Sequence, residues 1–136
     1  MIEAWAEPVG HDRFEIRESD ARGVPRAAIL PDLATCPACL ADVMTSGGRR
    51  EGYAFTNCTE CGPRFSIVRS LPYDRPHTTM RDFALCAACR EEYEDPTHRR
   101  FHAQPNACGD CGPHLALWDT DGRELAAGDE ALRQAE

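Results

Sequence analysis

The chain has 136 residues, a formal charge of −8 and a composition with 42% hydrophobic and 28% charged residues, which is typical of a folded soluble protein. No stretch approaches the 18 apolar residues of a membrane helix, and the first 20 residues carry Glu3, Glu7, Asp12 and Glu15 instead of the apolar block of a secretory signal. These features predict a cytoplasmic protein without a membrane span and leave eight cysteines to be explained.

The first 33 residues predict strand and linker rather than a compact domain. Apolar and polar residues alternate over 2–7 and again over 14–16, so residues 1–20 are interpreted as the remnant of a strand region. Gly23, Pro25 and Pro31 then interrupt any regular pattern. Residues 21–33 are therefore predicted to be a linker.

The cysteines form four C-x2-C pairs with gaps of 18, 24 and 18 residues between the pairs. The second half of this array repeats the first at an offset of 50, and residues 32–67 align with residues 82–117 without a gap. The alignment also superposes Arg49-Arg50 on Arg99-Arg100. The pattern indicates a duplicated module, with one copy at 34–68, a connector at 69–81 and the second copy at 82–118.

Two C-x2-C turns supply four thiolates at the spacing that a tetrahedral zinc ion requires. The predicted ligands of two Zn²⁺ ions are Cys36, Cys39, Cys58, Cys61, Cys86, Cys89, Cys108 and Cys111. Iron in a four-thiolate site is the less favoured metal, whereas a disulfide framework lacks an export signal and thioredoxin-like chemistry normally uses one such pair. Pairing within each copy closes the shorter loops, but interleaved pairing of the two copies stays open.

Short elements are expected around each pair of cysteines. Helices are predicted at 40–44 and 90–93, and strands at 65–68 and 115–118, the latter turning back through Asp121-Gly122 toward Leu125. Asp129 is expected to cap a final short helix. The fold class is thus a small metal-stabilised α+β protein with tandem four-cysteine zinc fingers, built as duplicated zinc-knuckle modules with short helices and β-hairpins.

The predicted core is small, so metal must supply much of the folding free energy. Glycines 62 and 112, which follow the last cysteine of each copy, are expected in the left-handed conformation. The apolar side chains available to the first copy are Leu33, Leu40, Val43, Tyr53, Phe55, Phe65 and Ile67.

The charge distribution disfavours nucleic acid as a partner. Eight thiolates and two zinc ions would take the net charge from −8 to about −12, and nucleic-acid affinity depends on neutralising phosphates. Local basic groups occur at Arg49-Arg50, Arg64, Arg69 and Arg75. We predict that these side chains are solvated or paired with carboxylates.

Three segments resemble one family closely. Residues 57–65 carry the pattern NCT-x-CGPRF, residues 71–75 read LPYDR, and residues 99–105 read RRFHAQP. Together with the cysteine spacing, these segments resemble the HypF family of hydrogenase maturation carbamoyltransferases. The resemblance implies a multidomain enzyme that uses carbamoyl phosphate and ATP to carbamoylate the C-terminal cysteine of HypE. The transferred carbamoyl group would become the cyanide ligand of [NiFe] hydrogenase.

The resemblance also assigns the ends of the chain. Residues 1–20 would be the last strand of an acylphosphatase-like domain, and residues 119–136 the lead-in to a YrdC-like domain. The chain itself would carry no catalytic residue and would contact neighbouring domains of the parent enzyme. We expect the docking residues in the second copy to be Arg99, Arg100, His102 and Gln104. The alternatives are a free-standing zinc-finger binding module and a thiol redox protein.

Overall fold

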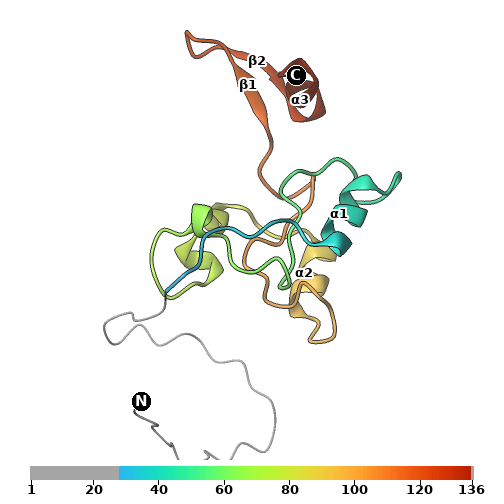
Figure 1. The fold of residues 1–136 in the computed structure, drawn as a ribbon, viewed down its shortest axis with the longest axis vertical. Coiled ribbons are helices and arrows are strands. Elements are labelled where there is room, and N and C mark those ends of the chain that lie inside the picture. The colour runs from blue at the N-terminus through green and yellow to red at the C-terminus, as the bar shows by residue number, and fades with distance from the viewer. Residues whose placement is uncertain (1–27, 136) are drawn as a thin grey trace, which may run out of the picture.

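A computed structural model describes residues 28–135 (Figure 1). The predicted strand region at 1–20 and most of the predicted linker lie outside the described residues. Within 28–135, no helix is both long and apolar enough to cross a bilayer. The elements, in chain order, are α1 (Pro37–Met44), the 3₁₀ helices η1 (Phe65–Ile67), η2 (Arg75–His77) and η3 (Thr79–Asp82), α2 (Ala87–Glu94), β1 (Ala116–Trp118), β2 (Glu124–Ala127) and α3 (Gly128–Gln134).

Helices α1 and α2 each begin directly after the first cysteine of a module. The Cys36 sulfur accepts a hydrogen bond from the backbone N–H of Cys39 at 3.4 Å, and Pro37 occupies the first turn, where its missing N–H costs nothing. Cys86 occupies the equivalent position before α2, although its side chain does not cap that helix. Both predicted helices are therefore confirmed, but each begins three residues earlier than predicted.

The sequence repeat is also a repeat of the backbone path. The N–H of Gly52 donates to the Val43 carbonyl at 2.9 Å, and the N–H of His102 donates to the Tyr93 carbonyl at 3.0 Å. Gly52 and His102 both have positive φ, at 66° and 49°. The loop after each helix therefore folds back in the same way, although only the first copy has glycine at the left-handed position.

One predicted strand is wrong and the other is confirmed. Residues 65–68 form η1 instead of a strand, and Val68 pairs only through an isolated bridge to Thr78. The predicted strand at 115–118 is present as β1, which pairs antiparallel with β2 across a turn in which Gly122 has φ 78°. These two strands and α3 form an arm that projects from the finger block (Figure 1).

The expected N-terminal cap of the last helix is also wrong. Helix α3 begins at Gly128, so Asp129 lies inside its first turn, and the residue at the cap position is Ala127. An acidic side chain in the first turn still interacts favourably with the helix dipole. Asp129 thus stabilises the end of the helix without capping it.

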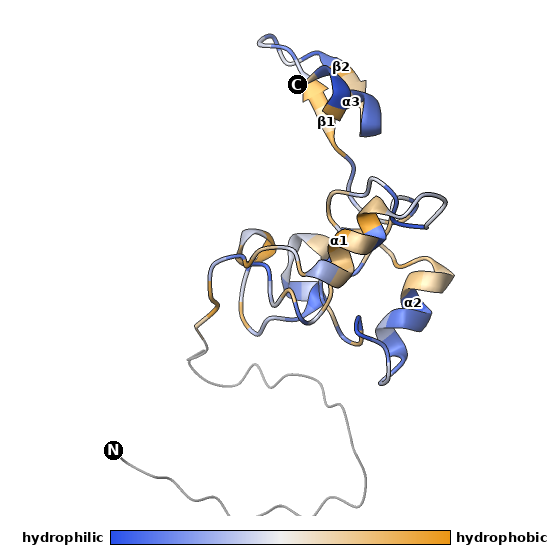
Figure 2. Ribbon diagram, turned by 45° about the vertical axis from the view of Figure 1, so that its right-hand side comes forward, coloured by the Kyte–Doolittle hydropathy of each residue, from blue (hydrophilic) through white to orange (hydrophobic). Residues whose placement is uncertain are grey.

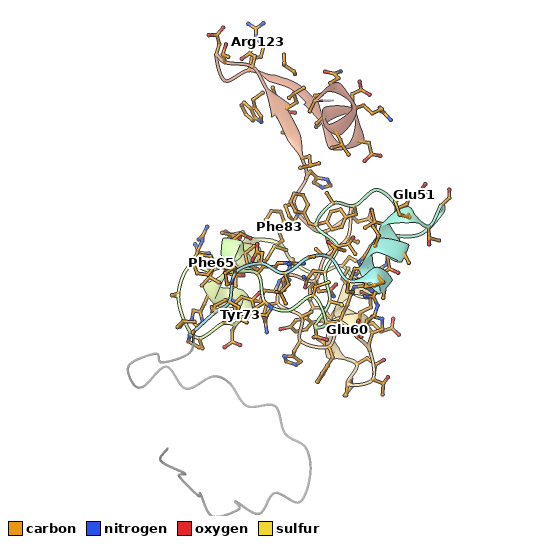
Figure 3. All side chains as sticks on the ribbon, in the orientation of Figure 1. Glu51, Glu60, Phe65, Tyr73, Phe83 and Arg123 are labelled. Carbon is orange, nitrogen blue, oxygen red and sulfur yellow. The ribbon has the colours of Figure 1, made fainter. Side chains whose placement is uncertain are left out.

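The interior differs from the predicted apolar core. Tyr53 is buried against Met80 and Ala107, with Ile67 packed at the edge, but Leu33, Leu40, Phe55 and Phe65 are exposed. Phe65 and Tyr73 lie on the connector side of the block, away from α1 and α2 (Figure 3). The buried groups are instead the cysteines and a set of hydrogen-bonded polar side chains. The fingers are therefore organised around sulfur and arginine more than around aliphatic packing.

The two glycines that follow the last cysteines have different roles. Gly62 is left-handed, with φ 73°, as predicted. Gly112 is outside the left-handed region, which corrects the prediction. A Cβ at Gly112 would lie 1.9 Å from Tyr53 Oη and 2.6 Å from Ala107 Cβ. Glycine is needed at 112 because the Tyr53 side chain occupies the space of a Cβ.

Candidate metal centres

The eight cysteines converge into two groups of four, one in each finger. Within each group the sulfur atoms all lie within 4.8 Å of one another, and no histidine of residues 28–135 joins them. One group is Cys36, Cys39, Cys58 and Cys61; the other is Cys86, Cys89, Cys108 and Cys111. The structure therefore shows local grouping within each finger and not the interleaved arrangement.

The sulfur spacing fits a tetrahedral metal ion. Cys36 and Cys58 sulfurs are 3.7 Å apart, and the Cys108 sulfur is 3.8 Å from those of both Cys86 and Cys111. Four thiolates at about 2.3 Å from a central zinc ion would be separated by about 3.8 Å. A disulfide would need about 2.05 Å, and all eight cysteines are free. The donor set and its dimensions thus suit Zn²⁺, which prefers closed four-thiolate sites in structural roles.

The thiols of each finger differ in how easily they ionise. Hydrogen bonding from the backbone N–H of Cys89 lowers the pKa of Cys86 to about 7. Burial raises the pKa of Cys39 to about 12, although Arg99 donates to its sulfur. When a metal displaces the proton of such a buried thiol, the resulting thiolate has no water to solvate it. Its charge must then be stabilised by hydrogen-bond donors from the protein.

Those donors come from the opposite finger. Arg49 and Arg50, which follow α1, reach the sulfur of Cys89 in the second finger, at 2.8 and 3.5 Å. Arg99 and Arg100, which follow α2, approach the sulfur of Cys39 in the first finger, at 3.0 and 4.0 Å. The sequence comparison aligned the two pairs but did not predict that they cross. The expectation that Arg49 and Arg50 are solvated or paired with carboxylates is therefore incomplete, because they pair with sulfur as well as with a carboxylate.

Of the remaining basic groups, Arg64 and Arg75 donate to backbone carbonyls instead of to carboxylates, which corrects the prediction for these two. Arg75 donates to the carbonyls of Gln104, Asn106 and Phe83 at 2.7–2.9 Å. Arg64 donates to the Leu33 carbonyl at 2.5 Å, whereas Arg69 is exposed, 4.0 Å from the Asp82 carboxylate. Arg75 is thus a structural cross-link of the connector.

The four predicted docking residues make contacts within the block. Arg99 and Arg100 form ion pairs with Asp42, and Gln104 Oε1 accepts from the Arg75 N–H at 2.7 Å and from the Tyr93 hydroxyl at 2.9 Å. The His102 ring stacks on that of Tyr93 with centroids 4.8 Å apart. Their role in docking stays a prediction.

A family model for the HypF finger matches residues 35–68 and residues 85–118, which are the two segments that hold the cysteine groups. The chain belongs to the HypF finger family. The two matched segments coincide with the modules seen in the repeat and in the fold, so the resemblance of the RRFHAQP and CGPRF segments is confirmed as a family relationship.

Relatives of this HypF finger region are much longer proteins. It is 62% identical to carbamoyltransferase HypF of Rhodobacter capsulatus over 112 residues, which cover 82% of the chain and 15% of the relative. It is 52% identical to carbamoyltransferase HypF of a Synechocystis strain over 122 residues, covering 90% of the chain and 16% of the relative. The crystal structure of T. kodakarensis HypF superposes with a TM-score of 0.69 at 45% identity, over 88% of the chain and 16% of that structure. The chain thus spans about a sixth of the length of these relatives.

Proposed function

We propose that the chain is a two-zinc structural and docking module of a HypF-type carbamoyltransferase, and that it does not catalyse a reaction by itself. The observation that carries this proposal is the pair of preformed four-thiolate groups, in which the sulfurs of Cys39, Cys58, Cys89 and Cys108 belong to fully buried residues. A closed and buried site with four protein ligands leaves no position for a substrate, as in structural zinc sites.

Zinc would supply the stabilisation that the small apolar core lacks. Structural zinc contributes on the order of 10 kcal/mol to the folding of small modules. The only buried aromatic or long aliphatic side chains among residues 28–135 are those of Tyr53 and Met80. The metal would therefore hold α1 and α2 against the loops that follow them, and its removal would unfold both fingers.

The activity belongs to the full-length protein in this proposal. Relatives named carbamoyltransferase are about six times as long as the aligned segment. In that context the parent enzyme would transfer the carbamoyl group from carbamoyl phosphate, with ATP, to the C-terminal cysteine of HypE in the cytoplasm. The fingers would set the spacing and orientation of the domains on either side of them.

A difference between the two fingers supports a contact site for a neighbouring domain on α1. Leu40 and Met44 lie one turn apart on α1 and are 54% and 75% exposed. The equivalent residues of α2 are Arg90 and Glu94, which form an exposed ion pair at 3.7 Å. Figure 2 shows the same contrast, with α1 largely hydrophobic and much of α2 hydrophilic. We assign the apolar face of α1 to contact with another domain of the parent enzyme, since only the α2 face suits solvent.

The internal contacts of the predicted docking residues give them an indirect part in this arrangement. Arg99 and Arg100 would fix the two fingers relative to each other, and Gln104 would tie the second finger to the connector. His102, which is partly exposed, would face a neighbouring domain. The thiol redox alternative is less well supported, because five of the eight cysteines are buried and all eight are gathered into the two four-sulfur groups. The nucleic-acid alternative is less well supported because Arg49, Arg50 and Arg75 are already bonded within the chain.

Metal analysis and helix content test the structural part of the proposal. The purified chain should contain two zinc ions, and a strong chelator should abolish the circular dichroism of α1 and α2, with recovery on adding zinc. A chain that keeps its helices without metal would contradict the structural role.

The docking part is tested in the full-length protein. Leu40→Arg together with Met44→Arg should make the fingers more sensitive to limited proteolysis and lower carbamoyl transfer, while zinc content stays at two per chain. The matched control is Arg90→Ala with Glu94→Ala on α2, which should change neither. If the α1 variant behaved like the control, the assigned contact face would be wrong.

A further inference from the structure

Each finger places its arginine pair on the metal site of the other finger. Arg49 Nη1 donates to the Cys89 sulfur at 2.8 Å, and the repeat-related Arg99 Nη1 donates to the Cys39 sulfur at 3.0 Å. Arg49 also pairs with Glu92 on α2, and Arg99 with Asp42 on α1. Asp42 and Glu92 occupy equivalent helix positions, each three residues after the second cysteine of its C-x2-C pair. The exchange is therefore reciprocal and involves the same atoms in both directions.

The second arginine of each pair is the buried part of this exchange. Arg50 and Arg100 are only 5% and 3% exposed. Arg50 Nε donates to the Ala107 carbonyl at 2.9 Å, and Arg100 Nε donates to the Asn57 carbonyl at 3.0 Å. These carbonyls precede Cys108 and Cys58, so each arginine fixes the backbone immediately before a cysteine of the opposite finger.

The geometry points to a coupled pair of metal centres, in which each centre is completed by the arginines of the other finger, so that metal binding to one finger favours metal binding to the other. Arg49, Arg50, Arg99 and Arg100 are the positioning residues of this coupling. The inference rests on the proposed metal-binding function, since it concerns how two bound ions affect each other.

Charge explains why the crossed arginines would matter to a bound metal. Four thiolates and one divalent ion leave a charge of −2 on each centre, held among buried groups. Two guanidinium groups offset that charge, and the nearby carboxylate of Glu92 or Asp42 holds them in place. Hydrogen bonds donated to a metal-bound thiolate are charge-assisted and stabilise it.

The coupling follows from where those arginines come from. Arg49 and Arg50 are held by the loop after α1, which includes the hydrogen bond from the Gly52 N–H to the Val43 carbonyl. If the first finger loses its metal and unfolds, that loop no longer presents the two guanidinium groups to Cys89. The same holds for the second finger and Cys39. By linkage, each metal must then raise the affinity of the other site by the same factor.

Metal populations in the wild-type chain test the coupling directly. The metal-free chain is titrated with Cd²⁺ and the species with zero, one and two ions are counted by native mass spectrometry. Independent sites of equal affinity would give about half of the chains one ion at half saturation, whereas coupled sites should give well under half. A one-ion population of half or more would overturn the inference while leaving the proposed function intact. Failure to bind two ions at all would instead overturn the proposed function.

Variants test the crossing. Zinc-loaded chains are exposed to a chelator and an alkylating reagent, and the modified cysteines of each finger are timed by peptide mass spectrometry. Arg49→Met should speed modification of the second finger by about 10- to 100-fold, and Arg99→Met that of the first finger, with a smaller effect in the finger that carries the substitution. Arg90→Met, on the exposed face of α2, is the matched control and should change neither.

The opposite pattern would overturn the crossing. If Arg49→Met released metal mainly from the first finger, or from neither, the contact with Cys89 would have no role in metal retention. Arg49→Lys keeps the positive charge and most of the aliphatic side chain, so it controls for a general folding defect caused by Arg49→Met. It should give an effect in the second finger between those of the wild type and Arg49→Met, because an ammonium group cannot donate to sulfur and carboxylate in the fixed geometry of a guanidinium.

Discussion

Gly112 is predicted to be one of the least replaceable residues of the chain. A Cβ at this position would lie 1.9 Å from Tyr53 Oη, whereas real Cβ contacts essentially never fall under 3.0 Å. Gly112→Ala therefore forces Tyr53 or the backbone to move by about 1 Å in a buried site. Overpacking of this kind costs about 1–3 kcal/mol, and about 2 kcal/mol would lower the melting temperature by about 10 °C.

The repeat supplies a matched control at Gly62. An alanine there would meet only the Leu33 Cδ1 atom at 3.4 Å, so its cost of about 1–2 kcal/mol comes from the left-handed backbone at φ 73°. Gly62→Asn should recover part of that loss, because asparagine tolerates this conformation better than alanine does. Gly112→Asn should be worse than Gly112→Ala, because the difficulty at 112 is space.

A double-mutant cycle with Tyr53 isolates the clash. The Tyr53 hydroxyl is buried without a hydrogen-bond partner among the described residues, so Tyr53→Phe should be neutral or stabilise by up to about 1 kcal/mol. In the Tyr53→Phe background, Gly112→Ala should cost about 1 kcal/mol less than in the wild type. The rescue is only partial, because Ala107 Cβ would still lie 2.6 Å from the new methyl group.

Thermal unfolding at fixed free zinc measures all these variants under one condition. The reasoning would be refuted if Gly112→Ala were no more destabilising than Gly62→Ala, or if Tyr53→Phe gave no rescue. Zinc content should be measured alongside, so that loss of metal and loss of packing are told apart.

The charged and strained groups lead to three further predictions. Glu92→Gln should destabilise the chain by about 3 kcal/mol, because it leaves the 5% exposed Arg50 without its carboxylate, whereas Glu94→Gln on the exposed face should stay within about 0.5 kcal/mol in the same thermal assay. His102→Ala should be less stable than His102→Gly, because φ 49° is strained for alanine and both variants lose the stacking on Tyr93; equal stabilities would contradict this. Zinc binding should release protons and weaken as pH falls anywhere below about 12, because buried thiols such as Cys39, with a pKa of about 12, must lose a proton to bind. Calorimetry in buffers of different ionisation enthalpy measures the release, and a pH-independent affinity would contradict it.

The metal sites could be predicted from the sequence because the ligand set of a four-thiolate site follows directly from the spacing of the cysteines. C-x2-C pairs with repeated gaps identify four-thiolate groups without any knowledge of the fold. The sequence left the choice between local and interleaved pairing open, since both use the same residues. The three-dimensional arrangement of the loops decides that question, and it groups Cys36 with Cys58 and Cys86 with Cys108.

The secondary structure was predictable where local signals were strong. Pro37 after Cys36 was an available signal for an earlier start of α1, since proline favours the first turn of a helix. The largely apolar segment at 65–68 suggested a strand, but a strand needs a partner, and Val68 finds only the single bridge to Thr78. Residues 116–118 find one in β2 because the turn at Gly122 returns the chain to them.

The core and the crossed arginines show what the sequence could not decide. Leu40 and Phe65 were expected inside on the basis of apolarity, but a module this small buries its sulfur centre and has little interior left for aliphatic side chains. The alignment of Arg49-Arg50 with Arg99-Arg100 signalled a shared role. It could not show that each arginine pair contacts the other finger. Contacts within one finger and contacts between the two fingers would give the same sequence repeat.

Cadmium-substituted NMR of the intact chain tests the central claim most directly. We predict two ¹¹³Cd resonances in the range of four-sulfur coordination, one coupled to the β-protons of Cys36, Cys39, Cys58 and Cys61 and the other to those of Cys86, Cys89, Cys108 and Cys111. A single resonance, or couplings that join cysteines of both fingers to one ion, would contradict the account of two metal centres that are separate in ligands and joined through their arginines.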